Sequence, residues 1–341
     1  MLLPFEPRTW DLAAAKGNEV ATCYWNNTPP FTRGDDEGEA THAVRMLLRH
    51  RRPAAAFHVL RMALHHKVAF ESGLLMDSLQ GWLEAASSAE KPSQPQGIEY
   101  DIHLLFQTLQ RELQGENPNV NIQRLAQLEW AYLGALDGHP ASPVTLHGLL
   151  RDQPDFFVDI LGLIFRPKNE VRENTPEPSE EENRRIQSAY RLLMAWQDVP
   201  GQRKDGMIDE EALLAWMNTA RSLAKERDLL EIADSRIGQV FAYAQEDPDG
   251  SWPCLPVRDA LEEMDSDDGF GGFGVGIYNK RGIFSKSLRE GGEQERELAK
   301  KYRHFAERCQ VDWPRTAAAL RRVAEGYEEE ARRADSKAML D

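Results

Sequence analysis

The residues best suited to chemistry gather in one segment, residues 41–70. The segment contains six arginines or lysines, five histidines and no acidic residue. The histidines are His42, His50, His58, His65 and His66. If the segment is helical, His58 shares a face with His65 or His66, since residues about seven or eight positions apart lie on one side of a helix. Zinc would need two further ligands and no cysteine is nearby, so the sequence predicts no metal site and no cofactor.

Two arginine–histidine pairs within this segment have a spacing that is used for RNA cleavage. Arg45 precedes His50, and Arg52 precedes His58. This pattern resembles the all-helical HEPN ribonucleases, in which a histidine follows an arginine after four to six residues. The resemblance implies a catalytic site at one of the two pairs. In that family a polar residue usually follows the arginine, whereas methionine or proline follows it here.

The charge of the whole chain limits what this basic segment is expected to bind. The 341 residues include 41 lysines and arginines against 56 acidic residues, a formal charge of -15. Such a chain is a poor general ligand for nucleic acid or membrane surfaces, so nucleic acid is expected, if at all, only at residues 41–70. The simpler interpretation is a basic helical surface that meets an acidic partner, for example residues 246–268 of the same chain. The expected partner is another protein, or another domain of a larger protein.

Glycines form a second cluster, with eight of the 24 glycines between residues 269 and 292. Gly269-x-Gly271-x-x-Gly274 matches the letters of the dinucleotide-binding fingerprint. That motif needs a strand before it and a helix directly after it, which together present a positive helix end to the pyrophosphate. The residues just before it are acidic and would repel phosphate. A nucleotide-sensing module is therefore a third hypothesis, behind the ribonuclease.

The glycine-rich stretch is predicted to be an ordered, non-helical insert. Glycine tolerates positive φ and loses the most entropy on ordering, so a cluster indicates backbone that must turn or be closely approached. Aromatic residues between the glycines argue against a flexible linker, and a small hairpin is expected around Asn279-Lys280. If the insert binds a partner, the residues that would do so are Phe270, Phe273, Tyr278, Asn279, Arg281 and Phe284.

Residues 205–209 resemble the middle of a calcium-binding loop, but the pattern fails elsewhere in the loop. Positions one, three and twelve of such a loop would carry no carboxylate here. We expect Gly206 to end a loop and Asp209 to cap the helix that follows.

The cysteines indicate a reducing compartment. Cys23, Cys254 and Cys309 are far apart and make no CxxC pair, and we expect all three to be buried structural thiols. The N-terminal residues do not have the pattern of a signal peptide, and no apolar run approaches the length of a membrane span. A cytoplasmic protein is expected.

The elements that position these residues are predicted to be helices, because apolar residues recur at intervals of three and four. The expected helices cover residues 8–25 with a break near Gly17, 37–51, 53–66, 71–86, 99–114, 120–137, 144–152, 154–165, 184–197, 209–225, 228–245, 257–264, 293–310 and 314–338. Residues 44–64 resemble the helical hairpins of tetratricopeptide or HEAT-like repeats, although no fixed period runs through the chain. The predicted fold is all-α, an irregular helical-hairpin (TPR/HEAT-like) array with an ordered glycine-rich insert near its C-terminus.

Three regions are expected along the chain. Residues 1–167 form an N-terminal helical-hairpin domain, and residues 184–341 form a C-terminal helical domain that contains the insert at 269–292. Between them, residues 168–183 are charged, acidic and proline-containing, which is typical of a linker.

Four motifs in the last third of the chain suggest a family. They are GxYNxRG (276–282), GGxQERELAxxYR (291–303), WPRTA (313–317) and YExEA (327–331). Together they resemble the C-terminal helical region of large uncharacterised bacterial proteins, some of which belong to defence-like systems with NTPases. The resemblance implies a recognition or regulatory module and transfers no catalytic residue. Non-catalytic protein recognition is therefore the leading hypothesis for the function.

Overall fold

The protein is built from helices throughout the part of the chain that the structure describes. The computed structural model describes residues 4–30, 35–86, 97–115, 118–136, 142–167, 178–282, 285 and 290–338. Within these residues there are seventeen helices and no strand, and about 74% of the described residues are helical. The predicted all-α class is therefore confirmed. The helices group into two compact units, residues 1–146 and residues 147–341.

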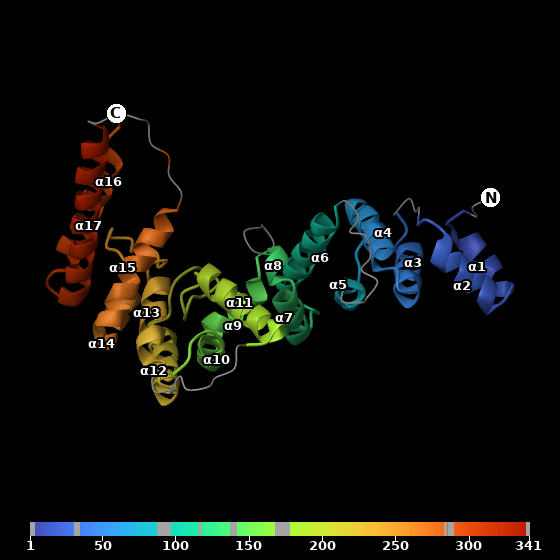
Figure 1. Cartoon of the computed structure of the whole chain (residues 1–341), viewed down its shortest axis with the longest axis horizontal. Helices are drawn as coiled ribbons and strands as arrows, with labels where there is room; N and C mark the ends of the chain where they lie inside the picture. The colour runs from blue at the N-terminus through green and yellow to red at the C-terminus, as the bar shows by residue number, and fades with distance from the viewer. Residues whose placement is uncertain are drawn as a thin grey trace. The chain divides into compact units, whose positions relative to one another are not determined.

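Figure 1 follows the helices in chain order from blue to red. The first unit holds α1 (Pro7–Ala15), α2 (Asn18–Asn27), α3 (Glu37–Arg49), α4 (Pro53–His65), α5 (Ser72–Ala86), α6 (Ile98–Leu113), α7 (Ile122–Ala131) and α8 (Leu133–Leu136). Helix α9 (Val144–Asp152) crosses the division. The second unit continues with α10 (Pro154–Ile164), α11 (Glu180–Ala195), α12 (Glu210–Glu226), α13 (Leu230–Phe241), α14 (Leu255–Met264), α15 (Asp267–Arg281), α16 (Glu293–Cys309) and α17 (Pro314–Ala338).

The second unit begins before the predicted linker. Helix α10 packs against α11 and α12, so the residues just ahead of the expected boundary belong with the helices that follow it. Of the predicted linker 168–183, only residues 178–183 are described, and α11 already begins there. Ser179 caps this helix, because its hydroxyl accepts from the Glu182 amide at 3.2 Å while the Glu182 carboxylate accepts from the Ser179 amide at 2.8 Å.

Two successive helices of the first unit end with the same motif. After α3, Arg51 takes a positive φ of 55°, and the amide of Arg52 donates to the carbonyl of Leu47 at 2.9 Å. After α4, Lys67 takes a φ of 62°, and the amide of Val68 donates to the carbonyl of Ala63 at 3.0 Å. This left-handed ending satisfies carbonyls that the helix itself leaves unpaired. It places a cation at the negative end of both helices, where the helix dipole stabilises it.

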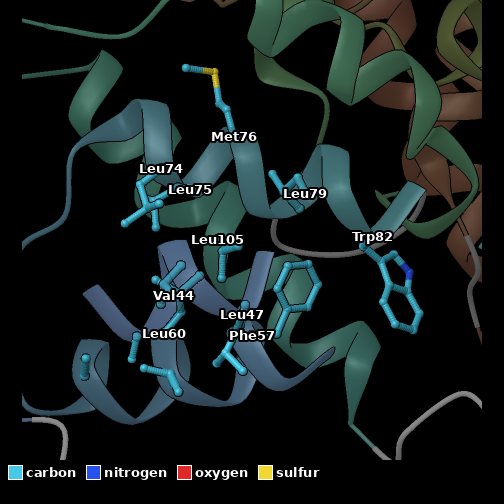
Figure 2. Close-up of a cluster of buried hydrophobic side chains, with 14 of the residues drawn as sticks. Val44, Leu47, Phe57, Leu60, Leu74, Leu75, Met76, Leu79, Trp82 and Leu105 are labelled. Carbon is cyan, nitrogen blue, oxygen red and sulfur yellow. The ribbon is translucent and has the colours of Figure 1, made fainter. Parts of the chain in front are cut away.

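The core of the first unit lies between α3, α4, α5 and α6. Figure 2 shows Val44 and Leu47 of α3 beside Phe57 of α4, with Leu75 of α5 and Leu105 of α6 closing the cluster. All five side chains are fully buried. Each side chain of this kind contributes about 1.5–3 kcal/mol on burial, and this packing fixes the basic helices α3 and α4 in place.

The glycine-rich stretch is a helix as far as residue 281, so the prediction of a non-helical insert with a hairpin at Asn279-Lys280 was wrong. Residues 267–281 form α15, which Ser266 caps through a hydrogen bond from the Gly269 amide at 3.3 Å. Helix α15 packs closely along α13. A methyl group on Gly272 would overlap the backbone of Ser235 on α13, and packing this close needs glycine.

The remaining helices of the second unit enclose one aromatic cluster. Trp252, in the loop before α14, lies 5.4 Å from the ring of Phe273 on α15 and 5.5 Å from that of Phe305 on α16. Helices α16 and α17 lie side by side as a long hairpin (Figure 1). In the described part of the chain, no helix combines the length and the apolar composition needed to cross a membrane.

Candidate functional site

Two histidines of the basic segment, His42 and His50, pack against the N-terminal helices. The ring of His42 stacks on Trp10 with 5.3 Å between ring centres. The ring of His50 stacks on Trp25 at 6.4 Å, and its Nδ1 lies 3.1 Å from Oδ1 of Asn26. Burial chiefly, and then two neighbouring arginines, lower the pKa of His50. These two rings hold α1 and α2 against α3.

The two arginines of the predicted catalytic pairs have structural partners. Arg52 donates from Nη1 to the carbonyl of Trp25 at 2.5 Å and to that of Thr28 at 2.9 Å. Both carbonyls lie at the end of α2, so the guanidinium caps that helix. Arg45 forms an ion pair with Glu71 at 3.1 Å between two exposed side chains.

His58 belongs to a partly buried network between α4 and α6. Arg61 donates from Nη1 to Oδ1 of Asp101 at 3.2 Å, and its Nη2 lies 2.9 Å from Nδ1 of His58. A guanidinium has no acceptor, so this His58 nitrogen accepts and the ring proton lies on Nε2. Burial, followed by the charge of Arg61, lowers the pKa of His58.

The four residues of the two predicted pairs are therefore held by four different sets of partners. In the described part of the chain, no hydrogen bond joins Arg45 to His50 or Arg52 to His58. The contacts of His50 and Arg52 connect helices to one another, whereas His58 contacts Arg61 of its own helix, and Arg61 makes the link to α6.

A second set of basic side chains is exposed. Arg49, Arg51, His65, His66 and Lys67 all face solvent at the ends of α3 and α4. Among the described residues, neither Arg49, Arg51 nor Lys67 forms an ion pair. The hairpin α3–α4 thus presents unpaired positive charge at both of its ends. This set is called the basic hairpin surface below.

The nucleotide and calcium patterns of the sequence have structural explanations. The fingerprint glycines Gly269, Gly271 and Gly274 all lie within α15, and helix α14 rather than a strand precedes them. The geometry that the fingerprint needs is absent at this position. In the calcium-like loop, Gly206 takes a φ of 85° and Asp209 accepts a hydrogen bond from the Ala212 amide at 3.1 Å, so the predicted turn and cap are confirmed.

Most of the predicted binding residues of the glycine-rich stretch pack inside the second unit. Phe270 and Phe273 are buried, with the Arg315 guanidinium 5.1 Å from the ring of Phe270. Tyr278 is half-buried against Tyr327 of α17, with ring centres 4.8 Å apart. These three side chains are part of the core and its rim.

The other three predicted binding residues have different positions. Arg281 is buried in an ion pair with Glu295, at 2.5 Å from Nη2 to Oε1, and also reaches Glu330 at 3.4 Å. Phe284 lies outside the described residues. Asn279 is exposed and lines a cavity.

That cavity has a volume of about 290 Å³ and is formed by α11, the residues that follow it, α13 and α15. Arg236 of α13 lines it and is only 6% exposed. Its Nη1 donates to Oε1 of Gln239 at 2.5 Å, and its Nη2 lies 3.5 Å from the carbonyl of Trp196. No carboxylate among the described residues pairs with this guanidinium, and its Nε has no hydrogen-bond partner. Burial lowers the pKa of Arg236 to about 10.

A neighbouring pocket of about 270 Å³ shares Tyr243 with this cavity. Lys280 and Lys301 both line it, between the rings of Trp252 and Phe305. The ammonium of Lys280 lies 5.5 Å from the Trp252 ring centre, and the ammonium of Lys301 lies 5.6 Å from that of Phe305. Burial, and then the charge of Lys301, lower the pKa of Lys280. The neighbouring pocket is also lined by the acidic Glu246, so it combines two lysines with one carboxylate.

Sequence reasoning did not single out Arg236, although a signal was present. Arg236 lies between Ala233 and Ile237 in the predicted helix 228–245, where apolar residues recur at intervals of three and four. A charged residue among the apolar positions of an amphipathic helix is unusual, because burying an unpaired charge is costly. The cavity itself depends on residues far apart in sequence and has no local signal.

One prediction about the cysteines was wrong. Cys254 and Cys309 are buried as expected, and burial raises the pKa of Cys254 to about 11. Cys23 is exposed instead. It lies on α2 beside Tyr24 and Trp25, which take the buried positions of that helix, so the cysteine is turned to the solvent side.

Comparison with known proteins adds no assignment. No protein-family model, curated protein or solved structure matches the chain. Within the described residues, no group of three histidine, cysteine or acidic side chains is arranged to hold a metal ion. The proposals below therefore rest on the geometry and charge of the chain itself.

Proposed function

We propose that this chain is a non-catalytic recognition or regulatory module, an irregular array of helical hairpins that binds an acidic segment of another protein. The observation that carries this proposal is the basic hairpin surface. Arg49, Arg51 and Lys67 are exposed without ion-pair partners among the described residues, in a chain whose formal charge is -15.

Some exposed cations elsewhere in the chain have ion-pair partners. On the hairpin α16–α17, Arg296 pairs with Asp335 at 2.7 Å and Arg303 pairs with Glu328 at 2.9 Å. Unpaired charge of one sign raises the rate of association with an oppositely charged surface and favours partners of that sign. A negatively charged protein segment is the partner that this chemistry fits.

The chain is also inferred to act as one part of a larger assembly. The tail motifs at 276–282, 291–303, 313–317 and 327–331 resemble those of large uncharacterised bacterial proteins, some of which belong to defence-like systems with NTPases. This resemblance supports a regulatory module that acts beside an enzyme, on a separate domain or a separate chain. The chain then supplies the recognition step.

Charge reversal on the hairpin tests the proposal. The triple variant Arg49→Glu, Arg51→Glu, Lys67→Glu is compared with the matched control Arg184→Glu, Arg185→Glu on exposed positions of α11. Each protein is cross-linked in the native host, purified and analysed by mass spectrometry. We expect one protein to be captured by the wild type, with cross-links from residues 41–70 to its acidic peptides, to be captured equally by the control, and not to be captured by the triple variant. Identical cross-links in all three would refute a role for the surface.

The same experiment separates two other partners. Cross-links from residues 41–70 to residues 246–268 of the same chain would mean that the surface serves an intramolecular contact. Copurifying RNA, lost in the triple variant, would mean that nucleic acid is the ligand. Either result replaces the protein partner proposed here.

The ribonuclease remains the alternative, and it has its own test. If Arg45–His50 or Arg52–His58 were catalytic, the purified wild type would cleave RNA and His50→Ala or His58→Ala would abolish cleavage without unfolding the chain. We expect no cleavage by the wild type. Reproducible activity lost in either variant would reverse the ranking of the two functions.

A further inference from the structure

The second unit contains a buried arginine that has no opposite charge beside it among the described residues. Arg236 is 6% exposed and has no carboxylate partner among the described residues. Removing a guanidinium from water is costly unless an opposite charge or a full set of hydrogen bonds replaces the solvent. Arg236 has Gln239 at 2.5 Å and a longer contact to the Trp196 carbonyl at 3.5 Å, and its Nε has no hydrogen-bond partner.

A second buried donor belongs to the same cavity. Trp196 lines the cavity of about 290 Å³ together with Arg236, and it is 1% exposed. Its indole Nε1 has no hydrogen-bond partner within the described residues. Buried polar groups in folded proteins are nearly always satisfied. Both unsatisfied groups are donors, and neither has an acceptor among the described residues.

The other polar side chains around the cavity are neutral and suited to orienting a ligand. Gln197, Gln239 and Asn279 provide amides, and Tyr243 provides a ring and a hydroxyl. The close packing of α15 on α13 brings Asn279 to this cavity, since a methyl group on Gly276 would overlap the Gln239 carbonyl. Among the described residues, no acidic side chain lines the cavity.

We propose that this cavity binds a compact organic oxyanion, a carboxylate or a phosphate monoester on a small ring, with Arg236 as its counter-ion. The planar guanidinium can donate two parallel hydrogen bonds to either group. Aromatic side chains, Trp196 and Tyr243, face the body of the ligand, and Asn279 orients it.

The lowered pKa of Arg236 agrees with this assignment. Burial is its main cause, and no carboxylate contributes to it. A bound oxyanion would supply the missing opposite charge, so ligand binding should stabilise the folded second unit.

Three related probes test the site by calorimetric titration and thermal unfolding of the full chain. Benzoate and phenyl phosphate carry the two candidate groups on the same ring, and benzamide is the neutral counterpart of benzoate. We expect saturable binding of benzoate or phenyl phosphate, a raised unfolding midpoint, and no saturable binding of benzamide. The better of the two anions identifies the ligand as a carboxylate or a phosphate.

Variants assign the binding to Arg236. Arg236→Met should weaken the binding of the preferred anion by about thirtyfold or more, which is the lower range for removing one partner of a buried charge pair. The control Arg184→Met, on an exposed position of α11, should bind as the wild type does. Without ligand, Arg236→Met should unfold at a higher temperature than the wild type, because an unpaired buried charge is gone.

A second variant tests anion binding at the cavity if Arg236→Met does not fold. Asn279→Ala changes an exposed residue and should weaken binding by about two- to tenfold, as for one ordinary hydrogen bond. Native mass spectrometry of the chain from its host should also reveal a bound small molecule. The proposal is overturned if neither anion binds, if benzamide binds as well as benzoate, or if Arg236→Met or Asn279→Ala binds like the wild type.

Discussion

Gly238 of α13 lies so close to Gly269 of α15 that a methyl group on Gly238 would overlap the Gly269 carbonyl oxygen. The same close approach recurs along the two helices. Gly272 faces the backbone of Ser235, and Gly276 faces that of Gln239. The distance between packed helices is set by the side chains at their contact, and glycine allows the closest approach. The glycines of α15 therefore serve the packing of a helix on a helix.

Alanine at Gly272 should destabilise the second unit, whereas alanine at Gly271 should stabilise it. A Cβ at Gly272 has no space, and overpacking of this kind typically costs about 1–3 kcal/mol. A Cβ at Gly271 meets nothing within 4 Å, and glycine in a helix interior costs about 0.5–1 kcal/mol relative to alanine. Chemical unfolding followed by circular dichroism measures both. Equal effects of the two substitutions would rule out close packing as the reason for these glycines.

This helix marks the limit of what could be predicted from the sequence. Periodicity located the helices on either side of it, because their apolar faces are encoded locally, as in 293–310 and 314–338. For residues 267–281 the glycine content argued against a helix, because each glycine in a helix interior is about 1 kcal/mol less favourable than alanine. Packing against α13 overrides that preference. The signal was the spacing of Gly269, Gly272 and Gly276, three and four residues apart on one helical face.

Among the candidate sites, too, those formed by neighbouring residues could be predicted from the sequence, and the one formed by several helices could not. The basic segment 41–70 and the turn at Gly206 could both be predicted from the sequence, because each depends only on residues that are neighbours in the chain. The cavity at Arg236 depends on α11, α13 and α15 coming together, and of its lining only Asn279 was a predicted binding residue. Sequence patterns report one element at a time, whereas a pocket is a property of several.

Removing Glu295 should destabilise the second unit. Glu295 is buried and pairs with Arg281 at 2.5 Å, so Glu295→Ala leaves a guanidinium in a largely buried site. Breaking a buried pair costs about 3–5 kcal/mol when the remaining charge has no other partner, and a smaller cost is expected here because Arg281 keeps its contact with Glu330 at 3.4 Å. The control Glu328→Ala removes the partner of Arg303 from a more exposed pair, for which about 0–1 kcal/mol is expected. Urea unfolding gives both values, and a similar small cost for the two would mean that the pair at Glu295 contributes little.

The three cysteines should react with alkylating reagents in two classes. Cys23 is exposed, whereas Cys254 and Cys309 are buried and burial raises the pKa of both thiols. Because the thiolate is the reactive form, native protein should take up one iodoacetamide quickly and the other two only after unfolding. Peptide mass spectrometry locates the label. Rapid native labelling of Cys254 or Cys309 would contradict the packing around Trp252, whose carbonyl lies 3.8 Å from Sγ of Cys309.

Acidification should weaken the attachment of the N-terminal helices through His50. Burial first, and then the charges of Arg49 and Arg52, lower the pKa of this ring below its ordinary value of 6.5. The folded chain therefore binds the proton less tightly than the unfolded chain does. The contribution of His50 to the free energy of unfolding is complete above the unfolded pKa and is lost as the pH falls through the folded pKa.

The corresponding variant is His50→Gln, which keeps a polar side chain beside Asn26 and cannot titrate. Between about pH 7.5 and about pH 5.5, the melting temperature of the wild type should fall more than that of His50→Gln. His58 and His147 contribute in the same direction, because burial lowers the pKa of both, so His50→Gln should remove only part of the pH dependence. His50→Gln combined with His58→Gln should remove more. If both variants keep the full dependence, the stacking of His50 on Trp25 at 6.4 Å does not govern how α2 is held.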